Sequence, residues 1–478
     1  MKVVKNFLYN ISYQLLTIIL PLITVPYVSN ILGAEGIGDY AFTFANTQYF
    51  VLFGMVGITL YGNRQIAYVR DDKEKLKNNF YSIYSLQLIT TLISLVMFLV
   101  FSIVLNKGMY RILYLAQGLN ILAAIFDISW LFMGLEEFKK TVIRNTIVKL
   151  ASLASIFLFV KTNEDIYIYI IILGASSLIG NLTFWMYIPK MIGLKNIKVN
   201  NLKVHLRASF ALFIPQIAIQ VYVLLDRTIL GILTDNIQVG YYENSQKLIK
   251  IALTIATAVG TVMMPKIANT VARGDMEKVK FYIKNSFFFV SGISIPLTFG
   301  LMAVAPKLST WFFTDKFKGI ETLIIITSVI IIIISWSNVI GTQLLVPLNK
   351  TKEFTISVTA GAIVNLILNL VIIKKFGAVG ACISTVVAEG IVTATQFYYV
   401  RKFLNISELI KPILSFIPPA ILMYICVSFI GNYMSSNIVT TIVQGICGIV
   451  IYFGGVEVIF RMIYKSGVVK YTKNKLIN

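Results

Sequence analysis

Long apolar runs, separated by short polar segments, cover almost the entire chain. A helix needs about 20 apolar residues to cross a ~30 Å hydrocarbon core, and most of the runs reach that length. The runs at 142–160 and 354–373 are close to the lower limit, which leaves twelve or thirteen crossings as alternatives to fourteen. The runs lie at 8–32, 40–62, 80–105, 111–134, 142–160, 166–188, 208–233, 241–264, 284–305, 321–346, 354–373, 378–400, 412–432 and 438–463. The pattern predicts an all-α polytopic membrane protein with about fourteen transmembrane helices.

The polar segments between the runs differ in charge from one side to the other. If the N-terminus is inside and the runs alternate, the inner segments hold 31 of the 42 Lys and Arg residues and the outer segments hold 8. Cytoplasmic segments of membrane proteins are enriched in Lys and Arg. The charges therefore predict that both termini are cytoplasmic.

The composition agrees with a membrane protein. Hydrophobic residues make up 57% of the chain and charged residues 13%, whereas an average soluble domain carries roughly a quarter charged residues. The net charge of +21 could indicate nucleic acid, but its one-sided placement explains it as topology. We therefore expect the lipid bilayer as a partner and no nucleic acid.

An internal repeat relates the two halves of the chain. The motif at 31–40, which contains Gly33 and Gly38, recurs at 231–242, so that Gly38 and Gly240 are 202 residues apart. Six predicted crossings separate the copies, so both halves have the same orientation and a pseudo-two-fold axis would run along the membrane normal. The repeat predicts a first lobe of six helices (1–205), a second lobe of six helices (206–403) and a final segment with two helices and a cytoplasmic tail (404–478). Two such lobes are expected to enclose a central cavity.

Polar side chains follow one face of three predicted helices. They recur at intervals of 3 and 4 residues (7 in the last interval of the run at 208–233), which keeps them on one side of a helix. Lipid cannot satisfy such groups, so these faces meet protein or water. The residues are Asn10, Gln14, Thr17, Pro21 and Thr24 in the first run, Gln216, Gln220 and Arg227 in the run at 208–233, and Glu243, Lys247, Lys250, Thr254, Thr257 and Thr261 in the run at 241–264.

Three basic residues, Arg227, Lys247 and Lys250, fall inside predicted helices. A cation in the hydrocarbon core costs at least ~2.5 kcal/mol, so its retention indicates a ligand path or an ion pair. Arg offers a bidentate fork to phosphate and Lys a point charge. We expect these cations to bind an anionic headgroup, with Gln14, Gln216 and Gln220 beside them; ion pairing for packing alone is the alternative.

Other charged residues are weaker candidates. Arg64, at the inner end of the second predicted helix, could receive an anionic group or act as a snorkelling anchor. Four acids, each with a structural role as the alternative, are candidates for ion coupling: Asp226, Asp127, Glu389 and Glu457. His205 is expected on the surface. No nucleophile, metal-ligand or phosphate-loop pattern is found, so we expect no catalytic residue, no metal and no cofactor.

The motifs and their order resemble a known family. The segment from Lys5 through Pro21 and Pro26-Tyr27 to Gly38-Asp39-Tyr40 is similar to the start of the bacterial Wzx-type polysaccharide repeat-unit flippases. These flippases belong to the multidrug, oligosaccharidyl-lipid and polysaccharide exporter superfamily. The segments 61–67 and 226–242 are similar as well, and the resemblance covers essentially the full chain.

The resemblance implies a flippase of the bacterial inner membrane. Such a protein moves undecaprenyl-diphosphate-linked oligosaccharide from the cytoplasmic to the outer leaflet, by alternating access through a cationic cavity. The product would serve capsule, exopolysaccharide or O-antigen assembly, and a polysaccharide polymerase and export machinery could be partners. Relatives that flip the peptidoglycan precursor use cavity arginines, and the first helix here departs from them because it has no Arg or Lys after Lys5.

Two other classes of protein fit the sequence less well. A cation-coupled multidrug exporter of the same superfamily would carry an acid in the first helix, and residues 6–32 contain none. A membrane-embedded polysaccharide polymerase or glycosyltransferase would need catalytic acids or bases on a large outer loop, whereas the longest outer segment is 306–319. The sequence therefore predicts a transporter and not an enzyme.

Overall fold

The computed structural model describes the backbone of residues 2–193, 199–465 and 467–468; the side chains of residues 2–17, 138–140, 215, 218 and 219 lie outside the description. Within these ranges the chain is nearly all helical and contains no strand. It divides into two compact units, Met1–Gly240 and Tyr241–Asn478. The all-α polytopic fold predicted from the sequence is confirmed.

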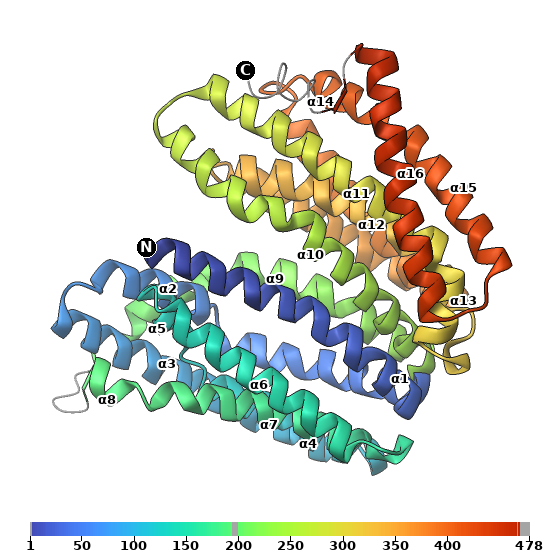
Figure 1. Ribbon diagram of the computed structural model, residues 1–478. Helices are drawn as coiled ribbons and strands as arrows, with labels where there is room; N and C mark the ends of the chain where they lie inside the picture. The colour runs from blue at the N-terminus through green and yellow to red at the C-terminus, as the bar shows by residue number, and fades with distance from the viewer. Residues whose placement is uncertain (1, 194–198, 466, 469–478) are drawn as a thin grey trace. The chain divides into compact units, whose positions relative to one another are not determined.

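The first unit is a bundle in which α1 packs on α3, α4, α6 and α9, and α4 packs on α7. Within this unit the long helices run roughly side by side (Figure 1). Its elements are α1 (Lys2–Met55), α2 (Ile58–Val69), α3 (Lys73–Val100), η1 (Phe101–Leu105), α4 (Gly108–Ile125), α5 (Ser129–Gly134), α6 (Phe138–Phe159), η2 (Asn163–Asp165), α7 (Ile166–Trp185), α8 (Ile188–Met191) and α9 (Leu202–Leu233).

The second unit is built around α11, which packs on α12, α14, α15 and α16. A large buried cluster that includes Phe287, Phe288, Phe416 and Phe460 fills the space between these helices. The elements are α10 (Asn236–Ala272), whose first residues belong to the first unit, α11 (Met276–Phe312), η3 (Asp315–Phe317), α12 (Ile320–Ser337), η4 (Asn338–Leu345), α13 (Thr351–Val400), α14 (Ile406–Ile413), η5 (Leu414–Phe416), α15 (Ile417–Tyr433) and α16 (Ile438–Tyr464).

Eleven helical segments in the described chain are long and apolar enough to cross a membrane. Two of them, at Ile18–Val69 and Thr351–Val400, contain 52 and 50 residues, or about 75 Å of helix at ~1.5 Å per residue, enough for two crossings each. Helix α9, with 32 residues, is not one of the eleven. If each of the two long segments crosses twice and α9 crosses once, the described helices make fourteen crossings, the number expected from the sequence.

Glycines break both of the long segments. Gly33 has φ 69° inside α1, and Gly377 has φ 54° inside α13. A side chain disfavours positive φ, whereas glycine adopts it readily. The corresponding break in the second half of the repeat falls at Thr234, between α9 and α10, where φ/ψ is −131°/−115°.

The repeat also reappears in the helix caps that follow. Asp72 precedes α3, and its carboxylate accepts hydrogen bonds from the backbone N–H groups of Glu74 and Lys75. Asp275 precedes α11 and accepts from the N–H of Lys278. Each Asp also pairs with the Lys three residues later, at 3.2 Å and 2.8 Å. The same capping device thus begins the equivalent helix in both halves, which supports the repeat.

The boundary between the compact units differs from the lobe boundary predicted from the repeat. The units meet after Gly240, whereas the repeat places the boundary after residue 205. The reason is that α9 packs on α1, α2 and α3, so tertiary contacts join it to helices that precede it in the chain. The lobe boundary after residue 205 reflects the repeat in the sequence, whereas the unit boundary after Gly240 reflects contacts between helices.

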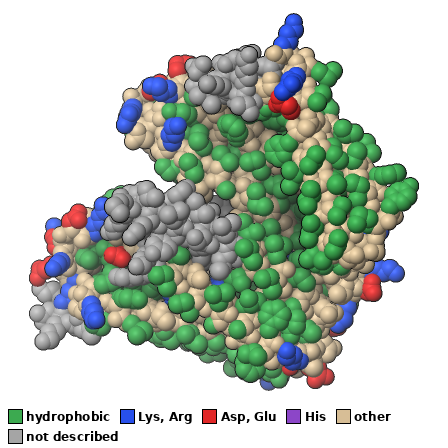
Figure 2. Space-filling view, in the orientation of Figure 1, with side chains coloured by type: hydrophobic (Ala, Val, Ile, Leu, Met, Phe, Trp, Pro, Cys, Tyr) green, Lys and Arg blue, Asp and Glu red, His purple; other side chains and the backbone are tan. Residues whose placement is uncertain are grey.

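The outer surface of the helices is apolar. On the visible face of each unit, hydrophobic side chains cover the middle of the helices, and Lys, Arg, Asp and Glu gather toward their ends (Figure 2). Exposed apolar side chains on α16, such as Ile449 and Phe453, are 61% and 63% accessible. A surface of this kind is suited to lipid, and the chain is a multi-pass membrane protein.

Candidate functional site

Arg227 and Asp226 lie near the end of α9 and are both buried. Their relative exposures are 7% and 3%. The Arg227 guanidinium donates a hydrogen bond from Nη1 to the Val223 carbonyl oxygen one turn earlier, at 2.8 Å. The sequence predicted a cation in this helix, and the structure shows that its side chain is buried in protein, away from the outer surface of the helices.

A hydrogen-bond network beside Arg227 fixes the position of α9 on α1. The Thr228 hydroxyl donates to Asn46 Oδ1 at 3.0 Å and lies 3.2 Å from the Tyr49 hydroxyl. Asn46 Nδ2 in turn donates to the hydroxyl of Tyr114 in α4, at 2.8 Å. The sequence analysis did not single out the four residues of this network, which are Asn46, Tyr49, Tyr114 and Thr228. Asn46 lies about two helical turns after Asp39 of the repeated motif, on the same helix.

The polar stripe of α10 is formed as the spacing predicts. Lys247 Nζ donates to Oδ1 of the fully buried Asn244 at 3.1 Å. The hydroxyls of Thr254 and Thr257 donate to carbonyl oxygens of their own helix, at 2.8 Å and 2.7 Å. The threonines are therefore satisfied locally, and the charged part of the stripe consists of Glu243, Lys247 and Lys250.

Lys250 is exposed on its own unit although it is far from either end of α10. It lies 14 residues beyond Asn236 in a helix of 37 residues, or about 21 Å along a helix of about 55 Å. An ammonium group at this depth is not left in lipid, because the cost is too high. Its surroundings must therefore supply water, protein or a ligand. Arg227 belongs to the first unit, and Lys247 and Lys250 to the second.

For the other candidates for substrate contact, the structure gives mainly the helix and the exposure of the side chain. Gln216 is partly buried and Gln220 is exposed on α9. Arg64 is exposed on α2, close enough for its charge to act on Tyr61. Gln14 lies in the part of α1 whose side chains are outside the described residues.

Two of the coupling candidates have local structural partners. Asp127 was expected inside a helix, but it lies in the break between α4 and α5, where its carboxylate accepts the N–H of Ser129 at 2.9 Å. Glu457 pairs with Arg461 at 2.8 Å and accepts the N–H of Val468 at 3.0 Å near the end of α16. Both geometries favour a structural role. Glu389 is partly buried in the second half of α13.

The expectation that His205 is a surface residue is wrong. His205 is 8% exposed, and its Nδ1 lies 2.7 Å from the hydroxyl of Tyr61, which is 4% exposed. The pair joins the start of α9 to α2. The polar composition of the neighbouring loop concealed this contact, because the two residues are far apart in sequence.

A second buried polar group, centred on Asp39, was also missed. Asp39 is 3% exposed and accepts hydrogen bonds from the Tyr110 hydroxyl at 2.9 Å and from Asn236 Nδ2 at 2.5 Å. Asn236 also bonds to the Tyr110 hydroxyl at 2.6 Å. The three residues tie together the second part of α1, the start of α4 and the start of α10, at the end of the first unit where Gly33 interrupts α1. The only signal in the sequence was that Asp39 belongs to the repeated motif.

The second unit contains an apolar groove of about 490 Å³ between α10, α11, α15 and α16. Its walls include Leu248, Leu297, Met423 and Ile449. It carries few polar groups: Tyr452 donates to Gly292 O and Gln444 Nε2 to Val427 O, each at 3.0 Å, whereas Gln444 Oε1 is buried without a hydrogen-bond partner in the described chain. Several glycines open the groove, and nothing lies within 4 Å of the position that a Cβ of Gly445 would take. The groove can hold a hydrocarbon chain but offers little to a sugar or a charged group.

Comparison with known proteins agrees with this picture. The family described as polysaccharide biosynthesis protein matches residues 3–271. A protein of Escherichia coli K12 named "Putative O-antigen transporter" is 26% identical over 405 residues, which are 83% of this chain and 96% of that protein. A Haloferax volcanii protein named "Probable low-salt glycan biosynthesis flippase Agl15" is 25% identical over 242 residues, 49% of this chain and 51% of that protein. These relatives are named as transporters and flippases, not as enzymes.

Solved structures share the fold. The lipid II flippase MurJ in an inward closed conformation superposes with a TM-score of 0.78 at 16% identity, covering 96% of this chain and 100% of that one. An inward-facing multidrug resistance transporter of the MATE family has a TM-score of 0.60 at 13% identity, covering 82% and 96%. The resemblance to the Wzx-type flippases and their exporter superfamily is thereby confirmed, and the chain belongs to the polysaccharide biosynthesis protein family.

Proposed function

We propose that this chain is a flippase that moves an undecaprenyl-diphosphate-linked oligosaccharide from the cytoplasmic to the outer leaflet of the bacterial inner membrane. The observation that carries the proposal is the placement of three cations in helices long enough to span the membrane: Lys247 and Lys250 lie well inside α10, and Arg227 is buried near the end of α9. A diphosphate has the charge that such a group of cations can stabilise.

The cations and the groove suit the two ends of such a substrate. Arg227, Lys247 and Lys250 contact the diphosphate during transport, and Gln216 and Gln220 offer hydrogen bonds to the sugars. The apolar groove beside α10 receives part of the polyprenyl chain. Leu248 in the groove wall is two residues from Lys250, so the site for the headgroup and the site for the tail lie close together along α10.

The transport cycle follows from this division. Both termini are cytoplasmic, the headgroup enters from that side, and a movement of the two lobes releases it on the other. The polyprenyl chain remains in or near hydrocarbon throughout, so only the polar headgroup has to be shielded from lipid. The product then supplies the assembly of capsule, exopolysaccharide or O antigen.

The test is translocation of undecaprenyl-diphosphate oligosaccharide in proteoliposomes. Wild type is compared with Arg227→Gln and Lys250→Gln at matched insertion, and with Lys107→Gln, an exposed lysine at the end of a helix, as the control. We expect transport by wild type and the control and at least about tenfold slower transport by the two variants, because each removes a charge-assisted contact of ~1.5–3 kcal/mol. Normal transport by both variants would show that these cations are structural. An inert wild type that exports a cationic drug would favour the multidrug exporter instead.

A further inference from the structure

An open pocket of about 440 Å³ lies at the turn between α13 and α14, lined by the residues from Arg401 to Ser407. Its lining shares no residue with the apolar groove. Arg401 and Lys402 are both exposed at its edge. The Arg401 guanidinium lies 3.9 Å from the centre of the Tyr398 ring, a cation–π contact that holds it over the last turn of α13.

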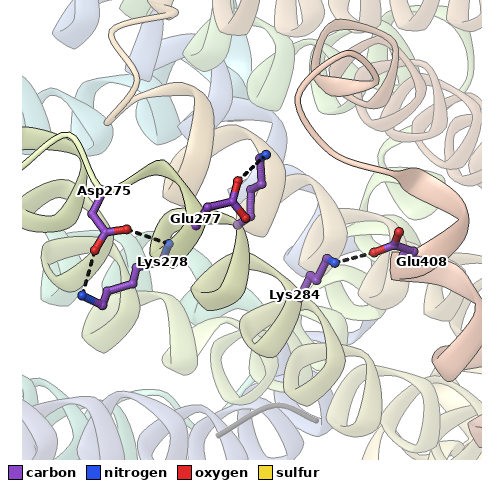
Figure 3. A network of polar contacts seen from close by, with 6 residues as sticks. Asp275, Glu277, Lys278, Lys284 and Glu408 are labelled. Carbon is purple, nitrogen blue, oxygen red and sulfur yellow. Dashed lines mark hydrogen bonds and ion pairs between the residues drawn. The ribbon is translucent and has the colours of Figure 1, made fainter. Parts of the chain in front are cut away.

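The turn is held firmly to the rest of the second unit. Leu409 and Ile413 of α14 are 4% and 2% exposed and belong to the large buried cluster. Glu408 of α14 forms an ion pair with Lys284 of α11 (Figure 3) and accepts a hydrogen bond from Asn405 Nδ2 at 3.0 Å. The pocket is therefore a fixed feature of the surface.

The charges around the turn are unevenly balanced. On the neighbouring α11, Lys278 pairs with Asp275 and Lys280 with Glu277, each at 2.8 Å (Figure 3). Within the described chain, by contrast, no carboxylate lies at ion-pair distance from Arg401, Lys402 or Lys411. Arg401 and Lys402 therefore present positive charge at the pocket, and Lys411 adds a third cation on α14, where Glu408 partly offsets it.

The surface next to these cations is apolar. Tyr398, at the end of α13, is 56% exposed, and Leu414, directly after α14, is 53% exposed. The turn follows a transmembrane segment and precedes the next one, so it lies where hydrocarbon gives way to headgroups. Basic pockets at the cytoplasmic membrane interface bind anionic lipid headgroups.

We propose that this α13–α14 pocket binds the phosphate headgroup of an anionic phospholipid of the inner leaflet. Arg401 and Lys402 contact the phosphate, Lys411 adds positive potential, and Tyr398 and Leu414 lie along the acyl chains. The lipid fastens α14 to the membrane surface. The proposal uses the inward orientation of this turn and is independent of which substrate the protein moves.

The experiment measures lipid binding to the full chain in detergent by native mass spectrometry. The probe is dioleoyl phosphatidylglycerol, and dioleoyl phosphatidylcholine is the zwitterionic reference. The variant is Arg401→Gln with Lys402→Gln, and the matched control is Lys374→Gln with Lys375→Gln, two adjacent exposed lysines on the same helix. We expect about thirtyfold weaker binding of phosphatidylglycerol to the variant, since it removes two cations that each contribute ~1 kcal/mol near the surface, and unchanged binding to the control.

Three results would overturn the proposal. The first is equal affinity of wild type for both lipids, and the second is an equal loss of affinity in the variant and the control. The third comes from inorganic diphosphate as a further probe: if it binds as tightly as the lipid and is lost in the same variant, the pocket is a site for a free or substrate diphosphate. The melting temperature of each variant is measured alongside, so that a folding defect is recognised before binding is compared.

Discussion

Gly38 and Gly240, which the sequence repeat relates, pack directly against each other. A Cβ built on Gly38 would lie 3.0 Å from the backbone nitrogen of Gly240, and a Cβ built on Gly240 would lie 3.1 Å from the nitrogen of Gly38. Each would also overlap a backbone carbonyl oxygen, that of Asn236 in one case and that of Ala34 in the other. The two repeated motifs thus meet at a near-symmetric helix crossing that leaves no room for a side chain.

Gly38→Ala and Gly240→Ala are each expected to destabilise the protein. The added methyl group meets backbone that cannot rotate away, and overpacking of this kind costs about 1–3 kcal/mol. Helix propensity acts in the opposite direction, favouring Ala over Gly by about 1 kcal/mol. The thermal unfolding midpoint of purified protein checks the expectation, with Gly390→Ala as the control because nothing lies within 4 Å of its Cβ position. A midpoint at or above that of wild type in both variants would contradict the crossing.

Filling the apolar groove is expected to slow transport without affecting stability. A Cβ at Gly445 meets nothing within 4 Å and points into the groove, so Gly445→Leu occupies space that the polyprenyl chain would take. Gly454→Leu is the matched control, because Gly454 lies on the same helix, is equally free of neighbours and does not line the groove. Transport in proteoliposomes should fall severalfold in the first variant only. Equal rates in both variants would exclude the groove from the transport path.

Removing the Tyr61 hydroxyl is expected to weaken the attachment of α9 to α2. Tyr61→Phe deletes the 2.7 Å hydrogen bond to His205 and leaves a buried imidazole nitrogen without it, which costs about 1 kcal/mol. Tyr68→Phe, on the same helix but 75% exposed, should be neutral. Chemical unfolding monitored by tryptophan fluorescence compares the two, and equal midpoints for both variants would argue against the contact.

The caps at Asp72 and Asp275 should make stability depend on pH in the acidic range. The backbone N–H of Lys75 lowers the pKa of Asp72, and the side-chain hydrogen bond from Lys278 lowers the pKa of Asp275, both from an ordinary value of 3.8. A lowered pKa means that the folded state prefers the charged carboxylate. The stabilisation is therefore complete at neutral pH and is lost as the pH falls below 3.8 through the lowered value.

Asp72→Ala and Asp275→Ala should accordingly unfold at lower temperature than wild type at pH 7. The difference from wild type should shrink as the pH is lowered below 3.8, because the wild-type carboxylates then become protonated too. Asp71→Ala, which removes the same charge from the exposed neighbouring position, serves as the control. A difference that stays constant with pH would show that the caps act without their charge.

The helices and their order could be predicted from the sequence. The thickness of the bilayer sets the length of each apolar run, and the lack of water in hydrocarbon requires each run to be helical. The repeated motif also located Gly33 and Gly38, because a break in a helix and a close crossing both need glycine at a particular position. The spacing of the polar residues in α10 placed Lys247 and Lys250 on one face of the helix, because a helix returns to the same face every 3 or 4 residues.

Only the tertiary structure decided which of these residues meet. His205 is buried because Tyr61, far away in sequence, reaches it. Asp127 accepts the N–H of Ser129, the first residue of α5, because α4 ends two residues before Asp127. The groove needs α10, α11, α15 and α16 together, and α9 joins the first unit through contacts with earlier helices. Periodicity reports the face on which a side chain lies. The partner on that face depends on packing between distant segments, which the local pattern does not contain.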